Sequence, residues 1–262
     1  MKKFLALIFA TLLFFGCAGS QGGDIPAGKV INVGVDDSFP PMGFRNENGE
    51  LVGFDIDLAK ETGKRMGVKF VFKPIDWEKK REELLSGNID MIWNGFNITE
   101  ERKEYALFSK PYMEDRQIFL VKKGEAAGIR SERDLTGKIV ATQAGATSET
   151  YVEQNEFIQH YAKEIKTFTR LTDALEALKN GEIDTFICDE IVARYDILSS
   201  PGNFEIIDVQ SDFYTGIGIG FRKDDVKLRD AVQKAFDEIV ADGTAKDISE
   251  KWFQADLIIH NR

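Results

Sequence analysis

Residues 84–102 read LLSGNIDMIWNGFNITEER, and this stretch decides the expected fold. Gly87 is typical of the glycine that ends a helix in a left-handed conformation. The apolar run at 89–93 indicates a buried strand, and Thr99 is a good N-cap for a helix that begins directly after it. A helix end, a buried strand and a new helix follow one another here, which predicts an α/β fold.

The layout of this stretch is repeated at residues 178–186, which read LKNGEIDTF. Both segments contain a helix end, a glycine, an Ile-Asp pair and an apolar strand. The first strand leads into residues 94–97, and the second leads into residues 188–190, which read CDE. Open α/β sheets bind ligands just beyond the carboxyl ends of their strands, so both polar segments are candidate ligand contacts.

Arg102 lies in the first turn of the expected helix, where a cation opposes the helix dipole by roughly 0.3–1 kcal/mol. A guanidinium beside backbone N–H groups freed by Gly95 and by the helix start predicts a site for a carboxylate or a phosphate. The alternative is a solvated arginine that pairs with Glu100 or Glu101. Because the second segment offers the anionic Asp189, the two segments facing each other would suit a zwitterion.

Strands that alternate with helices are expected along the rest of the chain, which supports the α/β class. The loop at 143–147 lies between a strand and a helix and offers backbone N–H groups to an anion. The segment GIGIGF at 216–221 superficially resembles a dinucleotide-binding motif. Its third glycine is misplaced and no helix follows directly, so it indicates close strand packing. The expected strands are 30–35, 68–72, 117–121, 139–142, 165–168, 185–188, 204–209 and 216–221, and the expected helices are 55–66, 77–86, 225–241, 244–253 and one from about 148.

The N-terminal residues indicate a targeting segment. Two lysines precede an apolar run at 4–15, which is too short for a membrane span of about 20 residues. Cys17 ends this run in a context that resembles the lipobox of bacterial lipoproteins. Residues 1–17 are therefore expected to be a lipoprotein signal peptide with Cys17 lipidated, and residues 18–28 a flexible tether. Ordinary cleavage nearby and an uncleaved anchor are the alternatives.

Charge and cysteine content narrow the classes of partner. The chain carries 34 basic and 44 acidic residues, a net charge of −10, and removal of Lys2 and Lys3 with the signal peptide makes the net charge −12. A nucleic acid or another polyanion is therefore not expected as a partner. Once Cys17 carries lipid, Cys188 is left alone, so no intrachain disulfide is expected.

Catalytic and metal-binding motifs are not found. His160 and His260 lie in polar contexts away from any nucleophile signature. The phosphate-loop, serine-hydrolase, zinc-protease and paired-cysteine motifs do not occur. We therefore expect a protein that is not an enzyme and that needs no metal or cofactor.

Five short motifs follow one another along the chain: FPPM at 39–42, GFDIDL at 53–58, ITEER at 98–102, FSKPY at 108–112 and KWF at 251–253. Together and in this order they resemble the polar amino-acid solute-binding proteins of ABC importers, over nearly all of the mature chain. The resemblance implies an α/β, two-lobed periplasmic-binding-protein type II fold with two hinge strands. Lobe 1 would comprise 29–114 plus 216–262, and lobe 2 would comprise 115–215. It also implies a monomer that traps an amino acid between the lobes and delivers it to an ABC permease in the cytoplasmic membrane.

The resemblance further implies how the ends of an amino acid are bound. Arg102 would bind the α-carboxylate bidentately, helped by the backbone of Gly95 and Asn97 and by the Thr147 amide. Asp189 would bind the α-ammonium. The competing role for Asp189 is an N-cap for the helix that begins near residue 190.

The ligand side chain would lie between Phe39 and Trp77, with Asp36 near its polar end and Gln143 beside it. The competing roles are core aromatics for Phe39 and Trp77 and a turn cap for Asp36. Cys188 and Gln143 depart from the residues usual in this family, at positions where side-chain specificity would be set. The expected ligand-binding residues are Asp36, Phe39, Trp77, Asn94, Gly95, Phe96, Asn97, Arg102, Gln143, Thr147 and Asp189.

Two other functions stay open on sequence alone. Dehydratases of the cyclohexadienyl type resemble these binding proteins, and in such an enzyme Glu114 or Glu190 would act as a general acid. The second alternative function is a sensory module that reports its ligand to a membrane partner. For a binding protein, Arg102 is the one cation at the matched positions, so we expect a neutral polar or cationic L-amino acid rather than glutamate or aspartate. The expected location is extracytoplasmic, with a lipid anchor in the membrane.

Overall fold

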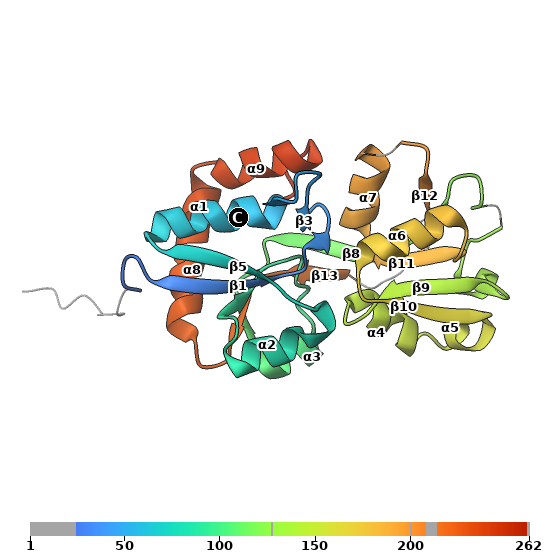
Figure 1. Cartoon of the computed structure of the whole chain (residues 1–262), viewed down its shortest axis with the longest axis horizontal. Helices are drawn as coiled ribbons and strands as arrows, with labels where there is room; N and C mark the ends of the chain where they lie inside the picture. The colour runs from blue at the N-terminus through green and yellow to red at the C-terminus, as the bar shows by residue number, and fades with distance from the viewer. Residues whose placement is uncertain (1–24, 127, 200, 208–213, 261–262) are drawn as a thin grey trace, which may run out of the picture.

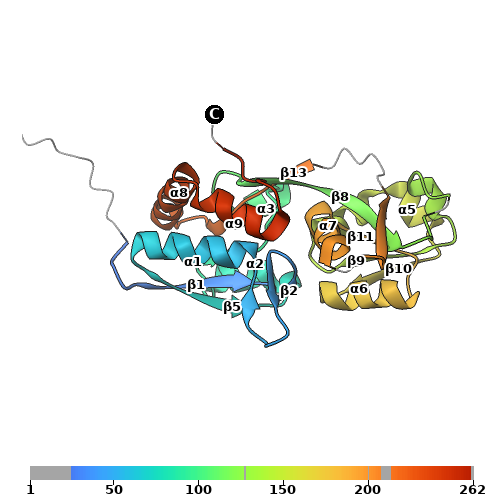
Figure 2. The same ribbon diagram turned by 90° about the horizontal axis from the view of Figure 1, so that it is seen from above.

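The computed structural model describes residues 25–126, 128–199, 201–207 and 214–260, which fold into two α/β lobes (Figures 1 and 2). Two strands, β8 (Met113–Lys122) and β13 (Tyr214–Ile217), run between the lobes. The expected α/β class and two-lobed fold with two hinge strands are confirmed. The predictions for the signal peptide, for Cys17 and for most of the tether concern residues outside the described ranges. Within the described ranges, no helix is long and apolar enough to cross a membrane.

Lobe 1 is built on a five-stranded sheet. Its strand order is β5 (Lys69–Pro74), β1 (Val30–Val35), β6 (Met91–Ile92), β14 (Gly220–Arg222) and β7 (Ala106–Phe108). The helices α1 (Phe54–Met66) and α9 (Thr244–Phe253) lie on one side, and α2 (Lys80–Ser86) and α3 (Glu100–Tyr105) lie on the other (Figure 1). The helix α8 (Val226–Ala241) packs on α1, and the short 3-10 helix η1 (Trp77–Lys79) leads into α2. A small sheet holds β2 (Ser38–Phe39), β3 (Gly43–Arg45) and β4 (Leu51–Val52).

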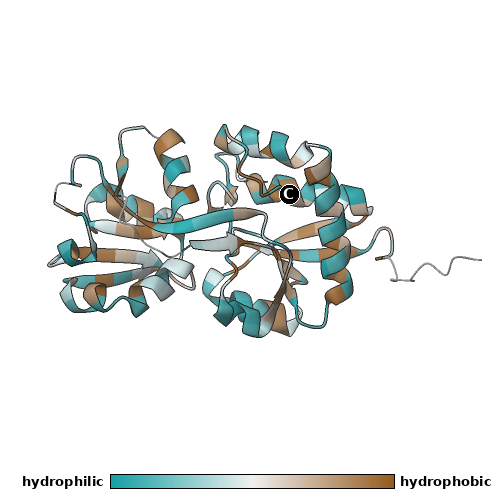
Figure 3. Cartoon of the chain, turned by 180° about the vertical axis from the view of Figure 1, so that it is seen from behind, coloured by the Kyte–Doolittle hydropathy of each residue, from teal (hydrophilic) through white to brown (hydrophobic). Residues whose placement is uncertain are grey.

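Lobe 2 is built on a second sheet with the strand order β10 (Glu164–Phe168), β9 (Ile139–Gln143), β11 (Thr185–Asp189), β8 and β12 (Phe204–Ile207). Its helices are α4 (Thr147–Gln154), α5 (Glu156–Tyr161), α6 (Leu171–Asn180) and α7 (Glu190–Ser199), with a 3-10 helix η2 (Glu132–Leu135). In both lobes apolar residues concentrate on the strands and on the helix faces turned toward them (Figure 3). Each lobe is therefore a layered α/β unit with its own sheet.

The hinge is an antiparallel pair of strands. β8 continues from the sheet of lobe 2 into the junction, where its first residues pair with β13. In this pairing Asp115 lies opposite Thr215, and Glu114 lies opposite Gly216. Two crossing strands leave few backbone torsions to change between the lobes, which suits a hinge motion.

The local signals read from the sequence are confirmed in the two repeated segments. Gly87 and Gly181 follow the last residues of α2 and α6 with φ of 81° and 75°, the left-handed conformation that glycine adopts at low cost. The Thr99 side chain accepts a hydrogen bond from the Arg102 amide and caps α3.

The glycine-rich segment 216–221 differs in part from the prediction. It is divided between β13 and β14 rather than forming one strand, because the chain passes from the hinge into the sheet of lobe 1. Close packing is confirmed, since a Cβ placed on Gly220 would lie 2.5 Å from the ring of Phe96.

Candidate functional site

The candidate site lies where the carboxyl ends of strands from both lobes meet. Asp36 follows β1 and residues 94–97 follow β6 on lobe 1, while Gln143 ends β9 and Asp189 ends β11 on lobe 2. At this site, side chains of the two lobes form hydrogen bonds with each other. The expected ligand-binding residues, which are all buried, are Asp36, Phe39, Trp77, Asn94, Gly95, Phe96, Asn97, Arg102, Gln143, Thr147 and Asp189.

Arg102 is held inside the cleft. Its side chain is only 4% exposed, and Nη1 donates to the Asn97 carbonyl oxygen at 3.1 Å. Nη2 donates to the Gly145 carbonyl oxygen of lobe 2, also at 3.1 Å, and the guanidinium lies 4.7 Å from the centre of the Phe96 ring. The alternative of a solvated arginine paired with a neighbouring glutamate is therefore wrong. Two of the five N–H donors of the guanidinium are used by these bonds.

Burial lowers the pKa of Arg102, and the nearby charge of Asp189 partly offsets this effect. An arginine stays protonated even after such a shift. The site therefore holds a fixed, desolvated cation that is bonded to neutral carbonyl groups, which is a strong binding partner for a carboxylate.

The expectation that the Gly95 amide helps to bind a carboxylate of the ligand is wrong, because this amide already has a partner within the protein. This N–H donates to the Asp55 carboxylate at 2.6 Å, and the Asp55 carboxylate also accepts from the Tyr112 hydroxyl at 2.7 Å. Burial raises the pKa of Asp55 to about 7. Gly95 acts instead through its shape, because a Cβ there would lie 2.8 Å from the ring of Phe39 and its φ is 56°.

Asn97 connects three parts of the molecule. Its Nδ2 donates to the Thr215 hydroxyl on the hinge at 2.8 Å, and its Oδ1 accepts from the Thr147 hydroxyl on lobe 2 at 2.9 Å. Backbone bonds between its two neighbours and β13 turn the Asn97 N–H away from that strand. Both the amide and the side chain of Asn97 therefore lie where the lobes close.

Asp189 is accompanied by a second carboxyl group that the sequence interpretation missed. Asp189 accepts from Gln117 Nε2, and Asp115 lies two residues before Gln117 on the same face of β8. Burial, together with the charge of Asp189 and a hydrogen bond to it, raises the pKa of Asp115 well above its usual range. Ionisation of Asp115 is thus disfavoured next to Asp189. The available sequence signal was that Asp115 and Gln117 are two residues apart on a strand, so their side chains lie on the same face.

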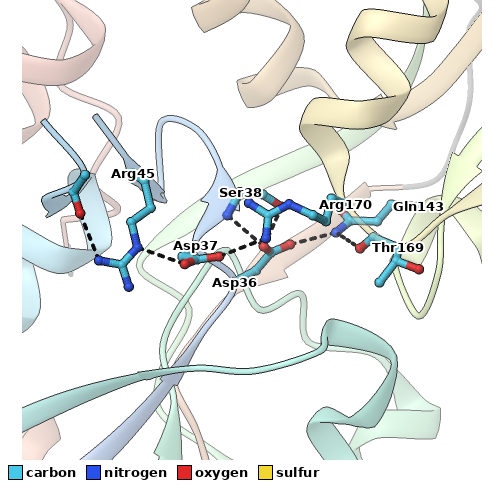
Figure 4. Close-up of polar contacts among 8 residues, drawn as sticks. Asp36, Asp37, Ser38, Arg45, Gln143, Thr169 and Arg170 are labelled. Carbon is cyan, nitrogen blue, oxygen red and sulfur yellow. Dashed lines mark hydrogen bonds and ion pairs between the residues drawn. The ribbon is translucent and has the colours of Figure 1, made fainter. Parts of the chain in front are cut away.

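Asp36 connects the lobes at the other end of the cleft. Oδ1 accepts from the Ser38 amide at 2.8 Å and from the Ser38 hydroxyl at 2.7 Å, so the turn-cap role is present. Oδ2 accepts from Gln143 Nε2 of lobe 2 at 2.7 Å, and this nitrogen also donates to the Thr169 carbonyl oxygen (Figure 4). Burial raises the pKa of Asp36. Outside this contact, Arg170 of lobe 2 pairs with Asp37 at 3.2 Å.

Several buried polar atoms lie beside Asp36. Among the described residues, both side-chain atoms of Asn94 and the Oε1 atom of Gln143 have no hydrogen-bond partner. Buried polar groups in proteins are almost always satisfied, so such atoms require an explanation. Asn94 Oδ1 lies close to Gly43, whose added Cβ it would meet at 2.2 Å, and the same Cβ would be 3.4 Å from the Asp36 carbonyl oxygen. These atoms therefore belong to one polar region at the Asp36 end.

The two expected ligand-sandwiching aromatics are packed against lobe 1. Phe39 lies against Gly95, and Trp77 meets the Phe96 ring edge-on at a centroid distance of 5.9 Å. Both are buried and belong to core clusters, as the competing interpretation expected. The role of Phe39 and Trp77 in stacking on the ligand side chain stays a prediction.

A second buried cation, Lys80, was missed from the sequence. Its Nζ donates to the Gly145 carbonyl oxygen at 2.6 Å and to the Trp77 carbonyl oxygen at 3.1 Å. Like Arg102, it lies in the first turn of a helix, which was the available signal.

Glu190 and Glu114 are the two carboxyl groups that a dehydratase-type enzyme would use as a general acid. Glu190 pairs with Arg116 at 2.7 Å and with Arg194 at 2.5 Å, and these arginines lower its pKa. Glu114 is exposed. A general acid at neutral pH needs a raised pKa, so Glu190 does not fit that role. In the ranges that the structure describes, no group of three or more histidine, cysteine or acidic side chains could hold a metal ion.

Comparisons with known proteins agree on one family. A profile of the bacterial extracellular solute-binding proteins, family 3, matches residues 31–255. The L-cystine-binding protein TcyJ of Escherichia coli (strain K12) is 32% identical over 228 residues, which cover 87% of this chain and 84% of the relative. The histidine-binding periplasmic protein of Salmonella typhimurium (strain LT2) is 34% identical over 265 residues, which cover 98% of this chain and 99% of the relative. A solved substrate-binding protein of a Streptococcus pneumoniae ABC uptake transporter, with bound histidine, has a TM-score of 0.83 and 35% identity, and the match covers 88% of this chain and 95% of that one.

Proposed function

The chain belongs to family 3 of the bacterial extracellular solute-binding proteins, and on that premise we propose that it captures an L-amino acid between its lobes and presents it to an ABC permease. The relatives described above carry the names of binding proteins, and this chain is likewise a binding protein and not an enzyme. The observation that carries the proposal is the burial of Arg102 on lobe 1 opposite Asp189 on lobe 2.

The two ends of the ligand backbone find opposite charges. The α-carboxylate binds the N–H donors of Arg102 that are not bonded to carbonyl groups, with the amides of Asn97 and Thr147 beside it. The α-ammonium binds Asp189, and the raised pKa of the neighbouring Asp115 disfavours a second full negative charge there. A desolvated charge pair of this kind contributes roughly 2–5 kcal/mol when one partner is removed.

The ligand side chain extends toward Asp36. Phe39 and Trp77 offer apolar ring faces, and Asn94 and Gln143 offer amide groups that have no partner among the described residues. Because Asp36 lies at this end and Lys80 lies at the Arg102 end, an acidic side chain would face a carboxylate. We therefore keep a neutral polar or cationic L-amino acid as the expected ligand, with glutamate and aspartate at least tenfold weaker.

The anchoring and the division into lobes are part of the proposal. We take residues 29–114 plus 216–262 as lobe 1 and residues 115–215 as lobe 2, which places both boundaries in the hinge pair of β8 and β13. The protein would act as a monomer outside the cytoplasm, held at the membrane by a lipid on Cys17. Mass spectrometry of the membrane-extracted protein tests this, and an unmodified residue 17 or a chain that starts elsewhere would refute the anchor.

A ligand screen tests the binding function. The full chain is heated with each of the twenty L-amino acids, cystine or ornithine, and hits are titrated by calorimetry. A ligand at a hundred times its Kd stabilises the folded state by about 2.7 kcal/mol. That corresponds to a rise in Tm of roughly 5–10 °C for a protein of this size. A screen in which no amino acid raises Tm or binds in calorimetry would overturn the proposed function.

A further inference from the structure

Lys80 and Arg102 form an unusual pair of cations in the cleft. Both side chains come from lobe 1, and both donate to a single acceptor on lobe 2, the Gly145 carbonyl oxygen, at 2.6 Å and 3.1 Å. The two positive groups are therefore separated by no more than two hydrogen-bond lengths. Two cations on one neutral oxygen repel each other, and the repulsion is strong where water is excluded.

Lys80 finds little compensation for its own burial. Its side chain is 7% exposed, and among the described residues no carboxylate lies within ion-pair distance of Nζ. Its other bond goes to the Trp77 carbonyl oxygen. Glu78, Glu101 and Glu149 line the same hollow of about 240 Å³ and act only at longer range. Burial, followed by the charge of Arg102, lowers the pKa of Lys80 to about 7.

These contacts exist only when the lobes meet. Gly145 has a φ of 69°, and a Cβ added there would lie 2.9 Å from Glu78 Cα and 3.1 Å from the Trp77 carbonyl oxygen. The turn of lobe 2 thus fits directly against the backbone of lobe 1. Opening of the hinge would separate Gly145 from Lys80 and return both cations to water.

We propose that Lys80 is a specificity-determining residue that, together with Arg102, makes closure of the lobes unfavourable unless the bound molecule brings a carboxylate. The inference rests on the proposed function, because the carboxylate is the one that Arg102 would bind. Once this anion neutralises Arg102, the repulsion on the Gly145 oxygen is removed and the closed form becomes favourable. Molecules with an ammonium group and a suitable side chain but without a carboxylate would bind poorly, since they leave both cations buried and uncompensated.

The selectivity for a carboxylate over an amide tests this inference. Calorimetry on the full chain compares L-arginine with L-argininamide, and L-glutamine with L-glutaminamide as a pair whose side chain is neutral. In Lys80→Met the aliphatic stem is kept and the charge is lost, so the ratio of acid to amide affinity should fall by at least roughly fivefold, a typical coupling between two interacting groups. The matched control is Lys79→Met, because Lys79 is the next residue, carries the same charge and is exposed.

The outcomes separate this inference from the proposed function. An unchanged or larger acid-to-amide ratio in Lys80→Met, or an equal fall in Lys79→Met, overturns the role of Lys80 and leaves the binding function intact. If the wild-type protein binds no member of either pair, small-angle scattering without ligand decides. A smaller radius of gyration for Lys80→Met than for wild type supports the inference, and an equal or larger radius overturns it. Far-ultraviolet circular dichroism and a cooperative melt confirm that each variant is folded.

Discussion

Replacement of Arg102 by lysine is the sharpest test of how the cleft binds an amino acid. Lysine keeps the positive charge but replaces a planar fork with a single ammonium group. In the structure the guanidinium spans the Asn97 and Gly145 carbonyl oxygens on different lobes while it lies against the Phe96 ring. An ammonium group cannot hold both carbonyls and also bind a carboxylate bidentately.

The expected loss follows from these contacts. Breaking one partner of a desolvated, hydrogen-bonded charge pair costs roughly 2–5 kcal/mol, and each 1.4 kcal/mol is about tenfold in Kd. Arg102→Lys should therefore weaken amino-acid binding by about thirtyfold to several thousandfold in calorimetry. The matched control is Arg81→Lys, because Arg81 is exposed, lies over the Tyr105 ring and is close to the same hollow. It should change Kd by less than about twofold, as expected for an exposed ion.

Stability should change less than affinity, because the contact with Gly145 exists only in the closed form. A hydrogen bond to a charged group contributes about 1.5–3 kcal/mol, and lysine keeps the positive charge and can still donate to one of the two carbonyl oxygens, so only part of this contribution is lost. A folded Arg102→Lys protein with near-wild-type Kd would refute the assignment of the carboxylate to Arg102. It would mean that backbone amides alone bind this end of the ligand.

Three further predictions concern Asp115, Asp189 and Gly145. Because the pKa of Asp115 is raised in the folded protein, this group binds more protons in the folded state than in the unfolded chain above its ordinary value of 3.8, so its contribution to stability falls as pH rises through that window. Asp115→Asn should remove this penalty, and urea unfolding from pH 4 to 8 should show a gain over wild type that grows with pH; a constant difference would contradict it. Asp189→Asn should weaken amino-acid binding at least tenfold in calorimetry, whereas unchanged binding would exclude Asp189 as the ammonium partner. Gly145→Ala should hinder closure, because its Cβ would lie 2.9 Å from the Glu78 Cα, and a radius of gyration that shrinks with ligand as in wild type would contradict that.

The parts of the site that the sequence predicted are those set by local chemistry. Thr99 as a cap, Gly87 as a helix end and Arg102 in a first turn each depend on neighbours within a few residues, and the structure has each of these local features. The role of Gly95 was wrong because the acceptor of its amide, Asp55, lies forty residues earlier in the chain. No local pattern reports such a contact.

Lys80 and Asp115 were missed for the same physical reason. A lysine in a charged helix start and an aspartate on a strand are both ordinary surface residues by composition. Their surroundings come from distant parts of the chain: Lys80 donates to the Gly145 carbonyl oxygen of the other lobe, and Asp115 pairs with Thr215 of the other hinge strand. Their roles depend on how the lobes meet, which is the longest-range feature of this fold.

The charges of the cleft are divided between its two sides in a way that explains why binding and closure must be coupled. Arg102 and Lys80 both belong to lobe 1, whereas Asp189 ends a strand of lobe 2 and Asp115 lies at the hinge. Asp36 also belongs to lobe 1, but it lies at the other end of the cleft. In the proposed binding mode, each lobe alone therefore pairs with one charge of the amino-acid backbone and leaves the other in water. In this binding mode, closure of the lobes would pair both charges of the ligand backbone at once, and the ligand would replace the water that each side loses. On this proposal the free energy of binding is gained mainly in the closed form, and lobe closure, which a permease would read, depends on the chemistry of the amino-acid backbone.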